Sequence, residues 1–239
     1  MFGILINGRI GTDMGVDLGT GNTLVHVRGQ GIVLNEPSVV AVQRGSRSVC
    51  AIGMDAKRML GRTTEHVLPV RPVRGGAIAD VDLAEEMLRR FLRRARARRR
   101  ISTRPRVVVG VPSGITEMER RAVRSSATAA GAKQVYMLPE PLAAAIGIGL
   151  PVDTPTGNMI VDIGGGTTEI AVIALGGIIC ETSIRIAGDD MDAAIVAYVR
   201  KHYGLLIGEP TAEAAKIELA TAIDDGEPRT TSVSGRDLV

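Results

Sequence analysis

Two short segments of the chain combine closely spaced glycines, hydroxyl side chains and a leading aspartate. The first runs from Asp17 to Thr23 and the second from Asp162 to Glu169. Glycines let backbone N–H groups approach a phosphate chain, hydroxyls add further donors, and a carboxylate holds a magnesium ion, usually through water. The two segments together predict a site that grips a magnesium nucleoside triphosphate.

Each residue type in these segments suggests a particular contact. Asp17 and Asp162 would face the metal. The predicted phosphate contacts are Gly19, Thr20, Gly21 and Asn22 in the first segment and Gly164, Gly165, Gly166 and Thr167 in the second. No Walker-type GxxxxGK[ST] string occurs, and strand-like residues rather than a helix follow the glycines, which excludes the Rossmann fingerprint. The expected geometry is two β-hairpins that hold phosphate from opposite sides.

Glu140 is a third candidate for chemistry. It lies between Pro139 and Pro141, where an alanine-rich helix begins between the two halves of the chain. A carboxylate held there could orient a water for attack on a terminal phosphate. An acidic residue also favours a helix N-terminus through the helix dipole, so the residues alone leave both roles open.

The residues around these segments predict alternating strands and helices. From Met14 the sequence indicates a meander of β-strands, and the stretch from Gly61 to Gly76, with Pro69, Pro72 and two adjacent glycines, indicates irregular connecting structure. A long helix follows, capped by Asp80 or Asp82, with an apolar stripe that begins at Leu83. The alternation predicts an α/β fold with a parallel or mixed sheet.

Shorter signals place the later elements. RVVVGVP is typical of a strand buried on both faces, and Thr116 and Glu119 have capping-box spacing at the start of the next helix. Near the end of the chain, one helix is expected to stop at Gly204 and another to begin at a Thr211 cap.

The second half of the chain repeats the opening theme of strand, carboxylate-led glycine turn and strand. The wide separation of the two copies indicates two related domains rather than a short tandem repeat. We assign residues 14–145 to the first domain, residues 146–239 to the second, and residues 1–13 to a possible membrane-binding N-terminal segment.

Composition and charge narrow the class of protein. Hydrophobic residues make up 45% of the chain and aromatic residues only 2%, so the cores must rest on aliphatic side chains. The arginine-rich run from Arg89 to Arg106 exceeds what a helix dipole calls for, but it lacks the aromatics of a base-stacking surface, so no nucleic-acid partner is predicted. The scattered Cys50 and Cys180 indicate a reduced, cytosolic protein.

Several stretches resemble motifs of the actin, Hsp70 and sugar-kinase ATPase superfamily, and within it the MreB family of bacterial actin homologues. VDLGTGNTLVHV resembles the first phosphate motif, MLPEPLAAAIG the connecting motif and VDIGGGTTEIAVIALGGI the second phosphate motif. The resemblance covers residues 14–239. It implies an α/β, actin-like ATPase fold with two related domains, the second C-terminally incomplete because family chains continue beyond SGRDLV.

The resemblance also implies roles. Asp17 and Asp162 correspond to carboxylates around Mg2+, Glu140 to the residue that positions the hydrolytic water, and Glu213 and Lys216 to contacts with the ribose and adenine of ATP. It implies a cytoskeletal ATPase that polymerises into antiparallel double filaments on the inner face of the cell membrane and maintains cell shape with the cell-wall elongation machinery. The alternative is a truncated paralogue with impaired nucleotide turnover that acts as a structural or regulatory filament partner.

Two parts of the sequence are candidates for the expected membrane contact. The apolar stretch from Met1 to Ile6 is either a frayed terminus or an interfacial anchor, and Ile101 occupies the position of an apolar membrane loop in the family. Arginines beside such an anchor favour anionic lipid headgroups. We therefore hypothesise that Met1 to Ile6 and the Arg93 to Arg100 region bind the membrane together, which predicts a cytoplasmic protein peripheral to the inner membrane surface.

Overall fold

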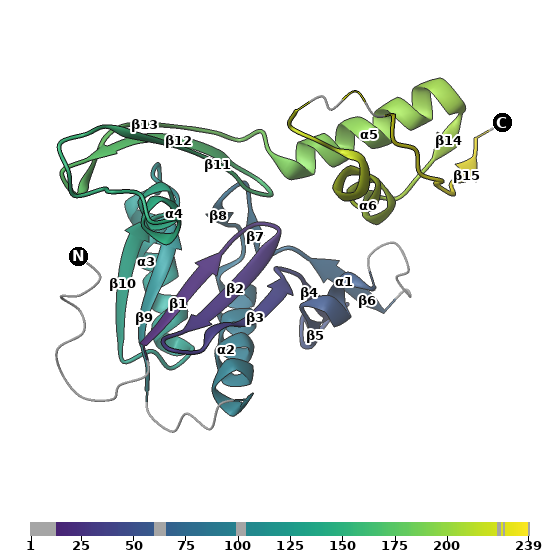
Figure 1. Cartoon of the computed structure of the whole chain (residues 1–239). Helices are drawn as coiled ribbons and strands as arrows, with labels where there is room; N and C mark the ends of the chain where they lie inside the picture. The colour runs from purple at the N-terminus through teal and green to yellow at the C-terminus, as the bar shows by residue number, and fades with distance from the viewer. Residues whose placement is uncertain (1–12, 60–65, 99–103, 224–225, 227, 239) are drawn as a thin grey trace. The chain divides into compact units, whose positions relative to one another are not determined.

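A computed structural model of the chain describes residues 13–59, 66–98, 104–223, 226 and 228–238 (Figure 1). The chain divides into two compact units, Met1–Arg185 and Ile186–Val239. The domain boundary predicted between residues 145 and 146 was based on the repeated glycine motif, whereas the division into compact units is based on contacts between residues. The predicted boundary stays a prediction.

The first unit is built on a five-stranded mixed sheet with the order β10-β9-β1-β2-β3. Its strands are β1 (Asp13–Leu18), β2 (Asn22–Val27), β3 (Gly31–Pro37), β9 (Arg106–Val111) and β10 (Gln134–Pro139). The first three form the antiparallel meander that the sequence predicts, whereas β9 runs parallel to both β1 and β10. The predicted α/β fold with a mixed sheet is confirmed.

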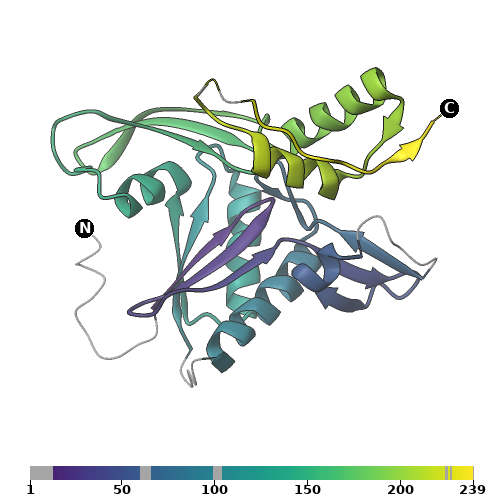
Figure 2. The same ribbon diagram turned by 45° about the vertical axis from the view of Figure 1, so that its right-hand side comes forward.

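Two helices pack against this sheet and against each other (Figures 1 and 2). They are α2 (Val81–Arg98) and α3 (Glu117–Ala129). The Asp80 carboxylate accepts a hydrogen bond from the Leu83 N–H at 3.1 Å, so of the two predicted caps Asp80 is the one that caps α2. The predicted capping box of α3 is present, with Thr116 and Glu119 satisfying each other's backbone N–H groups.

The core between the sheet and these helices is aliphatic, as the composition requires. Met14 and Val16 of β1 belong to one buried cluster with Met87 and Phe91 of α2. β9 is buried less completely than its sequence predicts, because only alternate residues are fully covered. The other face of β9 carries Gly110, where a Cβ would lie 3.4 Å from Glu140 Cγ, so this face borders the Glu140 side chain.

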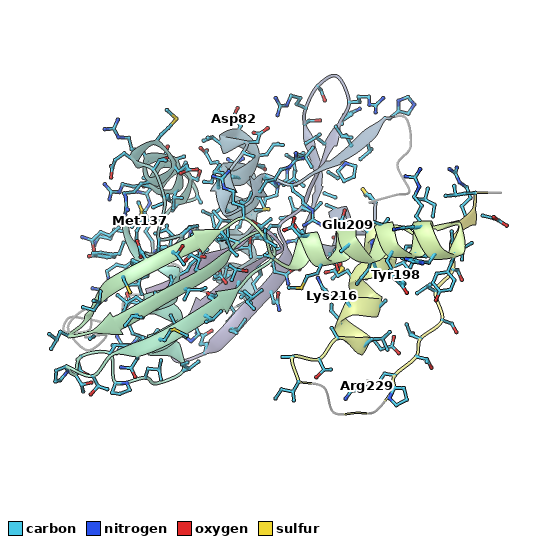
Figure 3. All side chains as sticks on the ribbon, turned by 90° about the horizontal axis from the view of Figure 1, so that it is seen from above. Asp82, Met137, Tyr198, Glu209, Lys216 and Arg229 are labelled. Carbon is cyan, nitrogen blue, oxygen red and sulfur yellow. The ribbon has the colours of Figure 1, made fainter. Side chains whose placement is uncertain are left out.

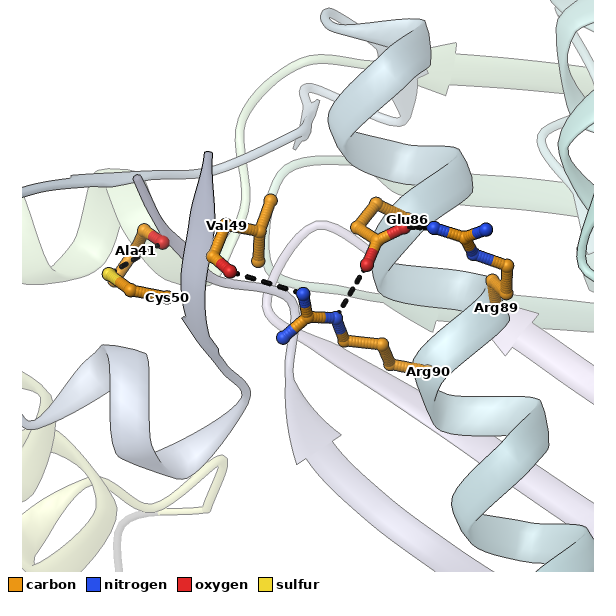
Figure 4. A network of polar contacts seen from close by, with 6 residues as sticks. All are labelled: Ala41, Val49, Cys50, Glu86, Arg89 and Arg90. Carbon is orange, nitrogen blue, oxygen red and sulfur yellow. Dashed lines mark hydrogen bonds and ion pairs between the residues drawn. The ribbon is translucent and has the colours of Figure 1, made fainter. Parts of the chain in front are cut away.

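A smaller sheet with the order β5-β4-β6 joins the first unit beside α2. Its elements are β4 (Val40–Gln43), β5 (Val49–Ile52), β6 (Val67–Val70) and the short helix α1 (Met54–Lys57). Arg90 links α2 to this sheet. Its guanidinium donates one hydrogen bond to the carbonyl of Val49 in β5 at 3.1 Å and another to Glu86 of α2 at 2.6 Å (Figure 4).

The prediction of irregular structure between Gly61 and Gly76 was wrong for residues 66–76, and residues 61–65 lie outside the described residues. Besides β6, this stretch contains β7 (Val73–Arg74), and β7 pairs with β8 (Ala77–Ile78). Pro69 misled the prediction, but β6 is an edge strand, where a residue without an N–H is tolerated.

The second glycine segment lies in a three-stranded antiparallel sheet with the order β11-β12-β13. Its strands are β11 (Asn158–Ile163), β12 (Thr168–Ala174) and β13 (Gly177–Ile184). Helix α4 (Glu140–Gly147) packs on this sheet, and Ala145 of the helix shares a buried cluster with Ile160 and Ile173. The helix predicted to start at Glu140 is therefore confirmed.

β1 and β11 have equivalent sequences but opposite burial. On β1, Met14 and Val16 are 2% and 3% exposed. At the equivalent positions of β11, which have the same spacing from the loop aspartate, Met159 and Val161 are 67% and 49% exposed. The repeat therefore reproduces the strand pattern, whereas the layer that covers β1 has no equivalent over β11 in the described part of the chain.

The second unit contains two helices and a short strand pair. The elements are α5 (Gly188–Tyr203), β14 (Leu205–Leu206), α6 (Glu209–Leu219) and β15 (Arg236–Asp237). α5 ends at Gly204 in the left-handed conformation, as predicted. The Thr211 cap was wrong: α6 begins at Glu209 after an extended Gly208, because Pro210 is suited to the first turn of a helix.

The buried cluster of the first unit generates a stability prediction. Phe91 is 0% exposed, so we expect Phe91→Ala to lower the free energy of unfolding by about 3–5 kcal/mol through lost burial and a residual cavity. Urea unfolding followed by circular dichroism measures the change. Val81→Ala, at the 43% exposed first residue of the same helix, is the matched control and should change stability by less than about 1 kcal/mol. Equal effects of the two substitutions would contradict the assignment of Phe91 to the core.

Candidate functional site

The two glycine segments meet within the first unit. A Cβ placed on Gly21 would lie 3.9 Å from the Cα of Gly165. A Cβ placed on Gly166 would lie 2.8 Å from Thr20 Oγ1 and 2.9 Å from the backbone nitrogen of Gly75. Because a side chain cannot come so close to backbone, only glycine at position 166 lets the loops approach. The structure therefore brings together the two hairpin turns that the sequence predicts.

Each turn is closed by its own backbone. The N–H of Gly164 donates to the carbonyl of Thr167 at 2.8 Å. In the first turn a Cβ on Gly19 would lie 2.8 Å from the carbonyl oxygen of Asn22. Tight turns of this kind leave successive N–H groups available to an anion, which is what a phosphate chain requires.

Ser38, at the start of the segment after β3, holds the first turn in place. Its hydroxyl donates to the carbonyl of Gly19 at 2.6 Å, and its N–H donates to the carbonyl of Gly21 at 2.9 Å. The Ser38 and Thr23 hydroxyls lie 2.9 Å apart, and both residues are fully buried. Sequence reasoning missed Ser38, because a single serine after a strand carries no signal of a partner nineteen residues earlier.

Besides the two glycine segments, the adjacent glycines Gly75 and Gly76 also border the site. The N–H of Gly76 donates to Thr20 Oγ1 at 3.0 Å. Gly76 has a φ of +74°, and a Cβ there would lie 2.9 Å from the Cγ2 of Thr167. The adjacent glycines were the available signal, but they were interpreted as part of a connector.

Four carboxylates gather around the meeting point of the two turns. They are Asp17 of β1, Glu140 of α4, Asp162 of β11 and Glu169 of β12. Burial, followed by the negative charge of Asp162, raises the pKa of Asp17 above its ordinary value. Repulsion between these two aspartates shows that the predicted metal carboxylates lie within electrostatic reach of one another.

Glu140 has the most strongly perturbed pKa of the group. Burial is the largest cause, and the charges of Asp17, Glu169 and Asp162 add to it, which raises the pKa of Glu140 from 4.5 to about 8. Gly110 of β9 makes room for this side chain, since a Cβ there would lie 3.4 Å from Glu140 Cγ. A carboxyl group poised near neutral pH suits proton transfer or water positioning.

Glu169 also belongs to the site. The sequence analysis named it only as the last residue of the second glycine segment and assigned it no role. It is 2% exposed, and its Oε1 accepts a hydrogen bond from the Ser113 N–H at 3.0 Å. Burial raises its pKa, and the charge of Asp162, which lies opposite it in the β11–β12 ladder, acts in the same direction. The available signal was an acidic residue at an inward position of the alternating strand TEIAVIA.

The arrangement fits a hydrated divalent cation. In the part of the chain that the structure describes, no three His, Cys, Asp or Glu side chains converge closely enough to ligate a metal directly. Magnesium commonly keeps several water ligands and binds through one or two carboxylates plus phosphate oxygens. Asp17 and Asp162 would hold such an ion, and its charge would relieve the repulsion that raises the pKa of Asp17.

The two predicted adenosine contacts lie on α6 of the second unit. Within that unit Lys216 Nζ lies 2.8 Å from the buried Oδ1 of Asp192 and donates to the carbonyl of Gly188 at 2.8 Å (Figure 3). The ammonium group thus links α6 to the start of α5. The roles of Glu213 and Lys216 toward ribose and adenine stay predictions.

The α/β sheet, with two hairpin turns that meet between clustered carboxylates, defines an actin-like fold. The chain matches the family model described as MreB/Mbl protein over residues 11–239. It belongs to the MreB/Mbl family.

Relatives and solved structures agree with this assignment. The chain is 52% identical over 235 residues to the cell shape-determining protein MreB of Escherichia coli K12, covering 97% of this chain and 68% of that protein. It is 47% identical over 227 residues to the cell shape-determining protein Mbl of Bacillus subtilis 168, covering 95% and 68%.

Among solved structures, MreB5 of Spiroplasma citri bound to ADP has a TM-score of 0.88 at 36% identity, over 95% of this chain and 68% of that one. MreB5 has also been solved with AMPPNP. The MamK double helical filament, with a TM-score of 0.71 and 23% identity over 87% of this chain and 64% of that one, shares the fold.

The buried position of Glu140 generates a pH prediction. The folded chain retains a proton on Glu140 between pH 4.5 and about 8 that the unfolded chain releases, so the free energy of unfolding falls as the pH rises through this window. We expect Glu140→Gln to remove that loss and to stabilise the chain more at about pH 8 than at about pH 5. Urea unfolding in EDTA at the two pH values measures the difference. Asp153→Asn in the exposed loop before β11 is the control, and an equal effect of Glu140→Gln at both pH values would refute the prediction.

Proposed function

We propose that the chain binds Mg-ATP through the two glycine turns and hydrolyses it as part of a polymerisation cycle. The observation that carries the proposal is the contact between the turns, where Gly21 meets Gly165 and the four carboxylates surround them. The ADP and AMPPNP complexes of MreB5, which is similar over nearly the whole chain, support a nucleotide at this site.

The residues divide the work by chemistry. Backbone N–H groups of the two glycine segments, other than that of Gly164, which donates to the Thr167 carbonyl, bind phosphate oxygens, and the Thr20 and Thr167 hydroxyls lie beside them. Asp17 and Asp162 hold the hydrated magnesium ion, which when bound neutralises charge on the phosphate oxygens. Glu140 in its ionised form holds the attacking water and accepts its proton, and the positive charge of a bound magnesium ion would favour that form by offsetting the carboxylates that raise the pKa of Glu140. Glu213 and Lys216 contact the ribose and adenine.

We further propose self-association into filaments and a role in cell shape through the cell-wall elongation machinery. The names of the MreB and Mbl relatives as cell shape-determining proteins, and the filament formed by MamK, support this part of the proposal. The filaments would lie in the cytoplasm, on the inner surface of the cell membrane.

A second candidate is a paralogue that joins filaments without turning over ATP. The exposed apolar face of β11, where Met159 is 67% exposed, favours this candidate. Within the described part of the first unit, the sheet that carries Asp162 is covered by α4 on one face and is open on the other. A sheet that lacks a layer can hold phosphate yet close poorly around it.

Nucleotide turnover and assembly of the Asp162→Ala variant decide between the candidates. For the ATPase we expect Asp162→Ala to abolish magnesium-dependent binding of a fluorescent ATP analogue, to lower phosphate release at least about 100-fold, and to suppress ATP-dependent light scattering. Asp153→Ala, an exposed aspartate in the loop before β11, is the matched control and should behave as the unmodified chain. If the unmodified chain hydrolyses no ATP, the second candidate is favoured. Equal turnover in the unmodified chain and Asp162→Ala would show that this site is not used.

The proposed membrane contact rests on Arg93 and Arg94, which are exposed on α2, and on Met1 to Ile6, which lie outside the described residues together with Ile101. The structure describes no helix long and apolar enough to cross a bilayer. We propose that attachment comes from the apolar terminus and from arginines, each arginine worth about 1 kcal/mol beside anionic lipid.

Vesicle binding tests this contact directly. We expect the chain to sediment with vesicles that contain anionic lipid, and we expect deletion of Met1 to Ile6 combined with neutralisation of Arg93 to Arg100 to abolish sedimentation. Neutralising Arg120 and Arg121 on α3 provides a control for general loss of charge. Unchanged sedimentation of the deleted and neutralised variant would end the hypothesis.

A further inference from the structure

Two buried polar atoms beside the carboxylate cluster make no hydrogen bond of normal geometry. They are Ser113 Oγ and Glu169 Oε2. The two residues are already joined, because the Ser113 N–H donates to the other carboxylate oxygen, Oε1, at 3.0 Å. The Ser183 side chain on β13 also interacts with the Glu169 carboxylate and lowers its pKa, but no side chain or backbone group forms a hydrogen bond of normal geometry with Oε2. A buried carboxylate oxygen and a buried hydroxyl in this state call for a polar partner.

The position of this pair points to the cation. Glu169 lies directly opposite Asp162 in the β11–β12 ladder. Ser113 follows the carboxyl end of β9, the strand that carries Gly110 against Glu140. The pair therefore joins the sheet that carries Asp162 to the loop after the strand that lies against Glu140.

No basic side chain accounts for the buried charge of Glu169. The charged groups that perturb the pKa of Glu169, Glu140 and Asp17 are all carboxylates, among the residues that the structure describes. A structural buried glutamate would be expected to have an arginine or lysine partner. Its second oxygen and the nearby hydroxyl are instead left for a partner that arrives with the ligand.

We propose that Glu169 is a positioning residue for the divalent cation, and that its Oε2 together with Ser113 Oγ holds a water of the hydrated ion. This inference rests on the proposed binding of Mg-ATP. Magnesium retains water ligands, and a water on the metal donates hydrogen bonds that a carboxylate accepts. Groups that orient the ligands of a metal contribute about 10–100-fold to its affinity.

Glu169→Gln is the decisive variant, because it keeps the shape of the side chain and removes its charge. The measurement is the magnesium concentration that half-saturates binding of a fluorescent ATP analogue to the full chain. We expect Glu169→Gln to raise this concentration about 10–100-fold and to leave binding of the analogue in EDTA unchanged. Asp153→Asn, in the exposed loop before β11, is the control and should leave both values unchanged.

Ser113→Ala provides a second test, because it keeps the N–H that binds Oε1 and removes only the hydroxyl. We expect a smaller rise in the magnesium requirement, with the circular dichroism spectrum unchanged. If Glu169→Gln fails to fold, the Ser113→Ala result alone decides the inference.

An unchanged magnesium requirement in folded variants would overturn the inference and leave the proposed function standing. If the unmodified chain binds no nucleotide in magnesium, the proposed function itself fails, and the inference fails with it.

Discussion

Repulsion among buried carboxylates is the constraint around which the first unit is organised. Four acidic side chains from four different elements gather at one place, and burial, followed by the charges of the other three, raises the pKa of Glu140 to about 8. Such a cluster is unfavourable in the absence of a cation, so the fold must hold it by other means. Glycine contacts between the turns, the Ser38 hydrogen bonds and the strand ladders supply that restraint. The carboxylates are thus held in place for a divalent cation before the cation binds.

The sheet topology explains why these side chains meet although they lie far apart in the sequence. β1 and β9 are parallel neighbours, so the turn after β1 and the loop after β9 lie at the same edge of the sheet. β10 adds Glu140 at this edge, because α4 starts directly after Pro139. The hairpin of β11 and β12 then brings its own aspartate and glutamate to the first turn. Each acid is positioned by the end of a regular element, which fixes it more rigidly than a long loop would.

The parts of the fold that could be predicted from sequence are those with a local signal. Periodicity located the meander and α2, capping spacing located α3 at Thr116, and glycine spacing located both turns. The parts that could not be predicted depend on contacts distant in sequence. Pro69 was interpreted as a strand breaker because nothing local shows that β6 lies at a sheet edge. Glu169 was passed over because its burial depends on the Ser113 loop, and the role of Gly76 depends on Thr20.

The unequal burial of β1 and β11 has a consequence for how the chain behaves in solution. The sheet β11-β12-β13 presents an apolar face, and in the described structure neither of its outer strands pairs with a further strand. Unpaired strand edges beside exposed isoleucine and methionine invite edge-to-edge addition of other chains, which is slow to reverse and indifferent to ATP. Turbidity of this chain therefore has two physical sources. Ordered assembly should respond to nucleotide, whereas growth through the bare sheet should respond to protein concentration and to mild apolar cosolvents.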